Sequence, residues 1–419
     1  MASLRASAVK YASGTIISQA LIVIATPVMT RLYAPAAFGE LALFSSLYGI
    51  LIHFTTLKLE LSILLPKERD TAVNSSVLGL WIAVAFTVLL GAMLLGDRAY
   101  QGLSWHYFFL PCALLAGAVF SLAQLWCSRE KDFLHIGLGN LINAAVNVGF
   151  CIGFFFVRPS SDILVIGYTL GLVAGAVYLA AIKWSVVRVV TAKFNALGFE
   201  KLRHMFTEGR SFPLYVLPNM LLTSLAYQLV PLLMVHYFSD SVVGVYSVAN
   251  RLLYLPSILV AGAFADIFRS ELMTRMHRGG DPVNFFRKSL GGLLLFVTFA
   301  YLMLWLLSPF LFRFFLGENF ATAGHYARYL CAGVAGNLIV TSFSYVFIAA
   351  QATRISLFLQ IASTAATVTG FWLGAIHHDI DAALLFMSHF SAAMALPFLY
   401  VADRELLAMS NRRRTEDAV

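Results

Sequence analysis

The chain is dominated by about a dozen apolar stretches, each long enough to form a helix that crosses a lipid bilayer. Hydrophobic residues make up 60% of its 419 residues and charged residues only 12%. A helix needs about 20 apolar residues to cross roughly 30 Å of hydrocarbon. Within lipid, only structures that pair every backbone polar group internally persist, and these stretches are too long and too evenly apolar for barrel strands. The sequence therefore predicts an all-α polytopic membrane protein.

About twelve transmembrane helices are expected, and the aromatic-rich connection 309–330 leaves that number open by one. The first stretch is too long for the apolar region of a signal peptide, and no small-residue cleavage site precedes the second, so we expect it in the mature protein. The predicted spans are 10–30, 37–64, 75–96, 106–127, 133–157, 162–183, 212–237, 241–268, 286–308, 326–350, 354–376 and 381–402.

Positive charges lie mostly on one side of these spans. With the N-terminus inside, the outer connections hold only Arg31, Arg98, Arg158, Arg313 and Arg328, and most other lysines and arginines fall inside. This asymmetry predicts that both termini are cytoplasmic. The net charge of +8 then comes from lysines and arginines on the cytoplasmic side, where they lie next to anionic membrane lipid. No nucleic-acid partner is expected. The four cysteines fall within spans and lack metal-ligand spacing.

An internal repeat organises the chain into two halves. Met29 through Leu47 aligns with Met234 through Leu252, and a second match pairs Leu138 through Phe150 with Leu359 through Phe371. Together the matches predict two pseudosymmetric six-helix lobes around a central cavity, related by an axis along the membrane normal. The expected divisions are an N-terminal lobe 1–183, a cytoplasmic interfacial linker 184–211, a C-terminal lobe 212–403 and a cytoplasmic tail 404–419.

The linker contains one amphipathic pattern. Leu197, Leu202, Met205 and Phe206 share a helical face among charged residues, which favours a helix lying on the inner leaflet. A solvated linker helix remains the alternative.

Polar residues at helical spacing mark four spans that the repeat relates to one another. Substrate sites in repeated transporter folds lie near the bilayer midplane between the halves, so these residues are candidates for a cavity lining. The candidates are Gln19 in the first span, His53 and Glu60 in the second, Asn219, Thr223 and Tyr227 in the seventh, and Arg251 and Tyr254 in the eighth.

Arg251 is the most specific candidate for contact with a substrate. It lies about ten residues, or roughly 15 Å, into its span, where a charged side chain costs on the order of 2.5–3.5 kcal/mol. Such an arginine should face a wet cavity or a partner. A guanidinium binds phosphate with two parallel hydrogen bonds, which suits an anionic lipid head group. The alternative is a structural pair with a carbonyl or with a carboxylate such as Glu60 or Asp266.

Each of the remaining candidates allows two interpretations. Lys58 and Arg31 could contact an anionic substrate, or could anchor span ends in the interface. Glu60 and His53 share a face of the predicted second span, where they could carry a coupling ion or form a satisfied polar pair. Asn143 and Asn147, with Asn140, line one face of the fifth span and suit either glycan hydroxyls or interhelical hydrogen bonds.

No catalytic arrangement is apparent. His377, His378, Asp379 and Asp381 form the one metal-like group, at a short outer turn that is more typical of a polar hairpin. No nucleotide-binding loop is present, and neither a metal nor an organic cofactor is expected. Coupling to H+ or Na+ is the energy source that the sequence leaves open.

Three segments resemble the Wzx-type polysaccharide transporters of the multidrug/oligosaccharidyl-lipid/polysaccharide exporter superfamily. They are TRLYAPAAFGELALFSSL at 30–47, VGVYSVANRLLYLP at 243–256 and LGENFATAGHYARYL at 316–330. The resemblance extends over the whole chain in span number and duplication.

The resemblance implies a flippase of the bacterial inner membrane that moves undecaprenyl-diphosphate-linked oligosaccharide units, for O-antigen, capsule or exopolysaccharide, to the outer leaflet by alternating access. It also implies polysaccharide polymerase and chain-length proteins as partners. From the resemblance, Arg251 is the expected diphosphate contact in this chain, and Arg31 and Lys58 are weaker candidates for the same role.

Two features separate the chain from other branches of that superfamily. It has fewer than the fourteen spans of peptidoglycan-precursor flippases, and its first span lacks the acidic residue of many drug exporters. A cation-coupled exporter of small amphiphiles and a membrane enzyme of glycan synthesis remain alternatives.

Overall fold

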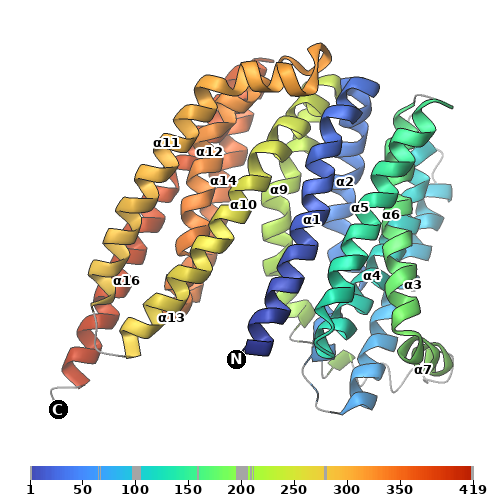
Figure 1. The fold of residues 1–419 in the computed structure, drawn as a ribbon, viewed down its shortest axis with the longest axis horizontal. Coiled ribbons are helices and arrows are strands. Elements are labelled where there is room, and N and C mark those ends of the chain that lie inside the picture. Colours follow the sequence, from blue (N-terminus) through green and yellow to red (C-terminus); the bar gives the residue numbers. More distant parts are fainter. Residues whose placement is uncertain are drawn as a thin grey trace. The chain divides into compact units, whose positions relative to one another are not determined.

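The computed structural model describes the chain over residues 2–64, 66, 68–96, 105–157, 160–194, 206–207, 210, 212–277 and 281–416. All regular structure within these residues is helical (Figure 1). The chain forms two compact units, Met1–Gln228 and Leu229–Val419, and each is described by itself.

The first unit contains α1 to α7, three short helical turns and the start of α9. Its elements are α1 (Ala2–Leu32), α2 (Pro35–Thr55), η1 (Leu59–Leu64), α3 (Arg69–Gly96), η3 (Trp105–Phe109), α4 (Leu110–Arg129), α5 (Phe133–Phe155), α6 (Ser161–Ile182), α7 (Trp184–Phe194), η4 (Phe212–Val216) and α9 (Leu217–Tyr237), which continues into the second unit.

The second unit contains the rest of α9 and seven further helices, with one short turn. They are α10 (Asp240–His277), α11 (Pro282–Leu316), η5 (Glu318–Phe320), α12 (Ala323–Phe343), α13 (Tyr345–Ala349), α14 (Thr353–Ala375), α15 (Ile380–Ala393) and α16 (Ala395–Glu416).

The prediction of an all-α multi-pass membrane protein is confirmed. Among the described residues, 11 helical stretches are long and apolar enough to cross a membrane. α1 adds a shorter apolar stretch, Ile16–Leu32. Several predicted spans differ in outline. α10 continues to His277 and α11 to Leu316, the tenth span divides at Ser344 into α12 and α13, and the last divides at Met394 into α15 and α16.

Four helix pairings recur in both units, as the sequence repeat predicts. In the first unit α5 packs on α6, α4 on α6, α3 on α4 and α2 on α4. In the second unit α14 packs on α15, α12 on α15, α11 on α12 and α10 on α12. α1 and α9 end, and α2 and α10 begin, at positions separated by 205 residues, which is also the offset between Met29 and Met234.

Small residues bring paired helices close together in each unit. A Cβ on Gly171 of α6 would lie 2.6 Å from the backbone oxygen of Asn143 on α5. In the second unit, a Cβ on Gly370 of α14 would lie 2.7 Å from the backbone oxygen of Phe386 on α15. Close backbone approach supplies the dispersion contacts that hold membrane helices together, because apolar burial gains little within lipid.

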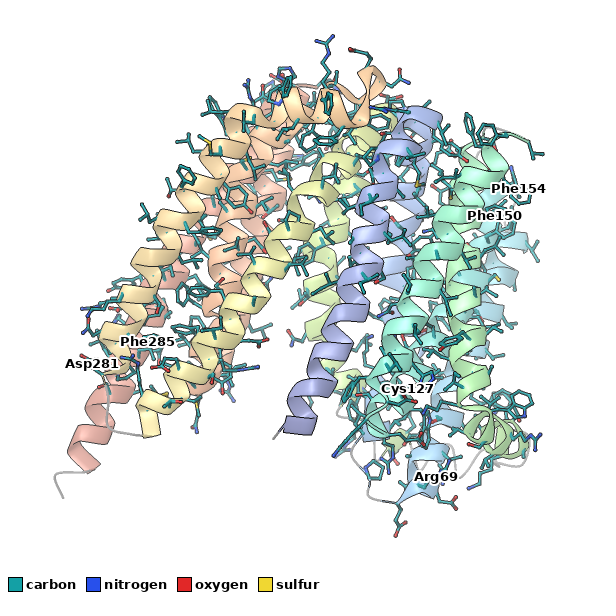
Figure 2. The ribbon with its side chains drawn as sticks, viewed as in Figure 1. Arg69, Cys127, Phe150, Phe154, Asp281 and Phe285 are labelled. Carbon is teal, nitrogen blue, oxygen red and sulfur yellow. The ribbon has the colours of Figure 1, made fainter. Side chains whose placement is uncertain are left out.

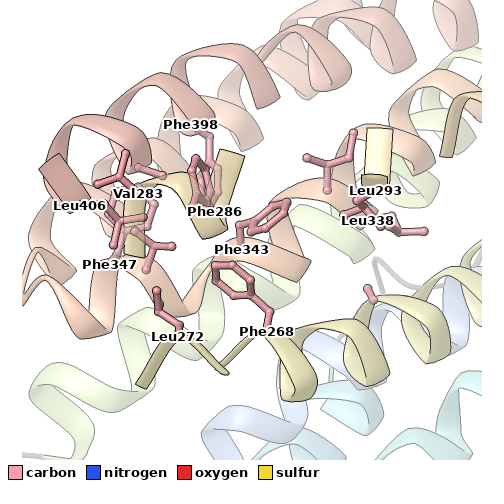
Figure 3. Close-up of a cluster of buried hydrophobic side chains, with 14 of the residues drawn as sticks. Phe268, Leu272, Val283, Phe286, Leu293, Leu338, Phe343, Phe347, Phe398 and Leu406 are labelled. Carbon is pink, nitrogen blue, oxygen red and sulfur yellow. The ribbon is translucent and has the colours of Figure 1, made fainter. Parts of the chain in front are cut away.

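Aromatic rings fill the core of the second unit. Phe268 of α10, Phe286 of α11 and Phe343 of α12 meet edge to face, with ring centroids 4.8 Å apart for Phe268–Phe343 and 5.0 Å for Phe286–Phe343 (Figure 3). Edge-to-face packing is the favoured geometry of buried aromatic pairs. These three rings therefore fix α10, α11 and α12 against one another.

The linker region begins with α7, which lies at the same end of the first unit as the start of α1 (Figure 1). Val186 and Val190 of α7 are buried in a cluster with α3 residues, and Trp81 of α3 stacks on Phe194 with ring centroids 4.5 Å apart. Most of the predicted amphipathic pattern lies outside the described residues, and only its Phe206 is placed, as an exposed side chain.

Candidate functional site

The second predicted span is not the continuous helix expected over 37–64. α2 ends at Thr55, and Leu57 and Lys58 adopt left-handed backbone with φ of 50° and 61° before η1 begins at Leu59. Left-handed backbone costs a non-glycine residue roughly 1–2 kcal/mol. The chain therefore turns sharply at Leu57 and Lys58, although neither residue is a glycine or a proline.

This turn places a buried carboxylate next to an ammonium. Glu60 is only 4% exposed, the Thr56 hydroxyl donates a hydrogen bond to Glu60 Oε2, and Lys58 Nζ lies 3.4 Å from Oε1. A carboxylate removed from water needs both charge pairing and hydrogen bonds. Thr56 and Lys58 supply them, and all three residues lie within one short segment.

His53 lies in the last turn of α2, before the break. Its Nδ1 is buried and has no hydrogen-bond partner within the part of the chain that the structure describes. Among the described residues, no hydrogen bond joins His53 to Glu60, because the turn at Leu57 and Lys58 removes Glu60 from the α2 face that carries His53. The predicted shared helical face is therefore wrong for this pair.

Two residues that the sequence analysis did not single out hold this segment in place. Arg129 at the end of α4 donates through Nη1 to the Ile63 carbonyl at 2.6 Å. Trp126, one turn earlier, donates to the Ser76 hydroxyl of α3 at 2.8 Å. Arg129 also lies over the Trp126 ring, so α3, α4 and η1 form one framework around the break.

The first part of α9 packs on α2 and carries the polar residues predicted for the seventh span. The Ser224 hydroxyl donates to the Gly49 carbonyl of α2 at 2.8 Å. Asn219, Thr223 and Tyr227, here named the α9 stripe, are exposed on the same helix. Thr223 Oγ1 donates to the Asn219 backbone carbonyl at 3.1 Å. The residue Asn219 itself is exposed.

The α5 asparagines lie against α6. Asn143 Oδ1 is within 2.7 Å of where a Cβ on Gly171 would stand, and Asn147 Oδ1 lies 3.5 Å from Cys151 Sγ. Asn140 Oδ1 accepts a hydrogen bond from Gln124 of α4. The Asn140 bond joins α5 to α4, whereas the Asn147 contact lies within α5. A glycan-facing role for Asn143 and Asn147 stays a prediction.

The other candidates are dispersed over both units. Arg31 is exposed in the last turn of α1, and Gln19 is half-buried. In the second unit, Arg251 is exposed and Tyr254 half-buried on α10. Asp266, considered as a partner for Arg251, is bound by Arg269 at 2.7 Å.

The acidic turn before α15 is a helix cap. Asp379 Oδ1 accepts from the backbone N–H groups of Asp381 and Ala382. Side-chain capping of this kind satisfies the free donors of a helix start. No cluster of His, Cys, Asp or Glu suited to a metal is present among the described residues.

A second charged cluster, here named the Lys183 latch, joins the α4–α5 turn to the end of α6. Lys183 donates to Glu130 Oε2 and to Asp132 Oδ2, both at 2.8 Å, and His135 Nδ1 lies 2.6 Å from Asp132 Oδ1. Burial opposes the charge on Asp132, but hydrogen bonds from Lys183 and His135 outweigh it and lower the Asp132 pKa. Burial likewise opposes the Lys183 charge, and its two carboxylate partners raise the Lys183 pKa.

Comparison with solved structures shows which fold the chain has. An inward-facing multidrug resistance MATE family transporter of the MOP superfamily aligns with a TM-score of 0.72 and 14% identity, over 96% of this chain and 99% of that chain. The lipid II flippase MurJ, in an inward closed conformation, also aligns with a TM-score of 0.72, at 12% identity over 96% and 89%. The chain therefore has the fold of MOP superfamily transporters. No curated protein matches it in sequence.

The family follows from the sequence itself. Residues 28–324 match the family described as polysaccharide biosynthesis protein, and the chain belongs to that family. The chain is thus a multi-pass membrane protein of the polysaccharide biosynthesis family, with the fold of the MATE transporter and of MurJ.

Proposed function

We propose that the protein is a flippase that moves undecaprenyl-diphosphate-linked oligosaccharide units from the inner to the outer leaflet of the bacterial inner membrane. The two halves would expose the glycan–diphosphate head to each side in turn. O-antigen, capsule and exopolysaccharide units belong to this substrate class, and a polymerase and a chain-length protein would act on the product.

One observation carries the proposal beyond the family. Arg251 is an exposed arginine about 16 Å from the start of a 38-residue apolar helix, at 1.5 Å per residue. An arginine at such a depth is costly unless it meets water, an acid or an anionic ligand. A diphosphate offers several oxygens in the geometry that a guanidinium prefers. Arg251 is therefore the proposed principal diphosphate contact, with Lys58 and Arg31 as further cationic contacts.

The α9 stripe supplies hydroxyl and amide groups suited to a glycan. Asn219, Thr223 and Tyr227 occur at a helical period on a span that is otherwise apolar. Gln19, His53, Asn143, Asn147 and Tyr254 complete the proposed cavity lining.

A cation-coupled exporter of small amphiphiles is the second candidate, because the MATE transporter and MurJ align with equal TM-scores. The fold alone does not separate these functions. The family match favours polysaccharide biosynthesis over drug export.

The test is a deletion of the gene, followed by measurement of which leaflet holds the lipid-linked oligosaccharide. A membrane-impermeant glycan-binding probe is applied to intact spheroplasts and to inverted vesicles. Accumulation on the cytoplasmic face, restored to outward display by the intact gene, is expected. Normal outward display together with increased drug sensitivity would instead establish the exporter.

A further inference from the structure

Tyr215 extends the α9 stripe by one helical turn. It belongs to η4, the π-helical turn that leads directly into α9. Tyr215, Asn219, Thr223 and Tyr227 follow one another at intervals of four residues, and all four are exposed. Residues four positions apart lie on the same side of a helix. Two tyrosines thus enclose an amide and a hydroxyl along a single row.

The exposed side of α9 in this stretch is polar throughout. Between Asn219 and Gln228, the exposed residues are those of the α9 stripe, and every other residue is at least partly buried. α11 shows the contrast, because it exposes apolar side chains such as Leu295 and Phe299, as expected for contact with lipid. An amide or hydroxyl that faces hydrocarbon without a partner is costly. The row is therefore suited to water or to a polar ligand.

Helix packing does not account for these polar residues. At the repeat offset of 205 residues, Asn219 and Thr223 correspond to Gly14 and Ser18 of α1. A Cβ on Gly14 would lie 2.4 Å from the Gly137 Cα of α5, and Ser18 is buried. The same side of the repeated helix thus packs on a neighbour through small residues in α1, and is exposed with larger polar residues in α9.

The chemistry of the row matches that of a sugar chain. A tyrosine ring offers a flat face of negative potential, which attracts the partly positive C–H groups on the face of a sugar ring. The Asn219 amide and the Thr223 hydroxyl can donate to and accept from sugar hydroxyls. Binding sites for small ligands commonly combine aromatic surface with a few placed polar groups of this kind. None of the four side chains is charged at neutral pH, so the row suits the glycan better than the diphosphate.

Anchoring in the membrane interface accounts for one tyrosine but not for both. Tyr215 is close to the start of the span Phe212–Tyr237, where tyrosines commonly hold a helix at the membrane surface. Tyr227 lies 15 positions after Phe212, or about 22 Å along the helix at 1.5 Å per residue. This is far from both ends of the 26-residue span.

We infer that Tyr215 and Tyr227 are two stacking platforms for sugar rings, and that Asn219 and Thr223 bind hydroxyl groups of the glycan between them. The two tyrosines are 12 positions apart, or about 18 Å along the helix. One sugar is too small to touch both rings, whereas a chain of several sugars can. The row therefore distinguishes a full oligosaccharide from a single sugar. This inference rests on the proposed function and adds how that function selects its substrate.

The experiment compares equilibrium binding of three lipids to the purified protein in detergent. They are undecaprenyl diphosphate, the same lipid with its first sugar only, and the full lipid-linked oligosaccharide. The full lipid is extracted from cells that lack the gene, and the one-sugar lipid from cells also blocked in the second glycosyl transfer. The variants are Y215L, Y227L, Y215F and Y227F, with Y400L as control, because Tyr400 is an exposed tyrosine of α16.

The wild type should bind the full oligosaccharide more tightly than the sugar-free lipid. Y215L and Y227L should each bind the full oligosaccharide about 2- to 10-fold more weakly than the wild type, and at most one of them should weaken binding of the one-sugar lipid. Binding of the sugar-free lipid should not change. The phenylalanine variants keep the ring and should resemble the wild type, as should Y400L. Y215Q and Y227Q also remove the ring, and they replace any leucine variant whose melting temperature shows that it does not fold.

Unchanged binding of the full oligosaccharide by Y215L and Y227L would overturn the inference. Equal losses by both variants for the one-sugar lipid would also overturn it, by assigning the effect to the helix as a whole. Equal affinity of the wild type for all three lipids would overturn it as well, while leaving a flippase that recognises the diphosphate alone. Failure of the wild type to bind any of the three lipids would remove the proposed function, and the stacking platforms with it.

Discussion

Gly171 on α6 faces the backbone of Asn143 on α5 so closely that a methyl group at Gly171 would stand 2.6 Å from the Asn143 carbonyl oxygen. This contact lies on a face of α6 where Gly167 and Gly175 also meet α5. The separation of the two helices is therefore set by residues that have no side chain. Because the obstructing atom belongs to a backbone, it cannot move aside cheaply.

Gly171→Ala should lower stability by about 1–3 kcal/mol, as expected for overpacking at a tight contact. Gly149→Ala is the matched control, because a Cβ there would meet nothing within 4 Å. It should be neutral or slightly stabilising, since alanine favours helix. Thermal unfolding of both variants in detergent checks the prediction, and equal melting temperatures would show that the α5–α6 contact is more adaptable than its geometry indicates.

Lys183→Met should destabilise the first unit by about 1–3 kcal/mol, because Glu130 and Asp132 both lose the Lys183 donor and Asp132 keeps only His135. Lys193→Met is the control, since Lys193 pairs with Asp70, whose side chain is 80% exposed, and such surface pairs contribute little. Fluorescence-detected unfolding should therefore separate the two lysine variants. Similar losses for both would contradict a structural role specific to the Lys183 latch.

The latch also predicts a pH dependence. The Asp132 pKa is lowered in the folded protein, so its contribution is present above about pH 3.9 and is lost as pH falls below that value. The Lys183 pKa is raised, so its contribution is present below about pH 10.4 and is lost as pH rises through a still higher value. The stability difference between the wild type and Lys183→Met should be flat from about pH 5 to about pH 10 and shrink outside that range. A difference that changes near neutrality would assign the dependence to another group.

Helix number and the repeat were predictable because both depend on patterns that survive in the sequence. Apolar length defines the spans, and the 205-residue offset of Met29 and Met234 recurs in the ends of α1 and α9. The break after Thr55 was not predictable. The segment that follows, LKLELSIL, contains neither glycine nor proline, so no helix-breaking residue marks the end of α2.

The candidate site was predicted in part for the same reason. Spacing found the α9 stripe, because its residues recur every four positions on one exposed helix face. Spacing missed the Lys183 latch, whose partners lie 51 and 53 positions away in sequence. It also placed Glu60 on the α2 face of His53, because a 3.6-residue period assumes that the helix continues.

Asn219→Leu and Thr223→Val should reduce translocation without lowering stability. Both side chains are exposed, and beyond the bond from Thr223 to the Asn219 carbonyl within the same helix, an apolar replacement removes hydrogen-bonding groups offered to a ligand. The loss of one or two such bonds corresponds to about a tenfold decrease in rate. Ser224→Ala is the contrasting variant, since its hydroxyl binds the Gly49 carbonyl and its removal should lower the melting temperature instead. Unchanged translocation by the double stripe variant would remove these residues from the glycan path.

Arg251→Ala should abolish surface glycan while the protein accumulates at normal levels, if Arg251 binds the substrate diphosphate. Arg251→Lys should restore it partly, because lysine keeps the charge but loses the paired donors of the guanidinium. Arg269→Ala on the same helix is the matched control, since Arg269 is exposed, pairs with Asp266 and lies over Tyr345. Surface glycan and membrane-protein levels are measured together in a deletion strain that carries each variant. A wild-type phenotype for Arg251→Ala would exclude this residue as the diphosphate contact, and equal defects in both alanine variants would assign the effect to α10 as a whole.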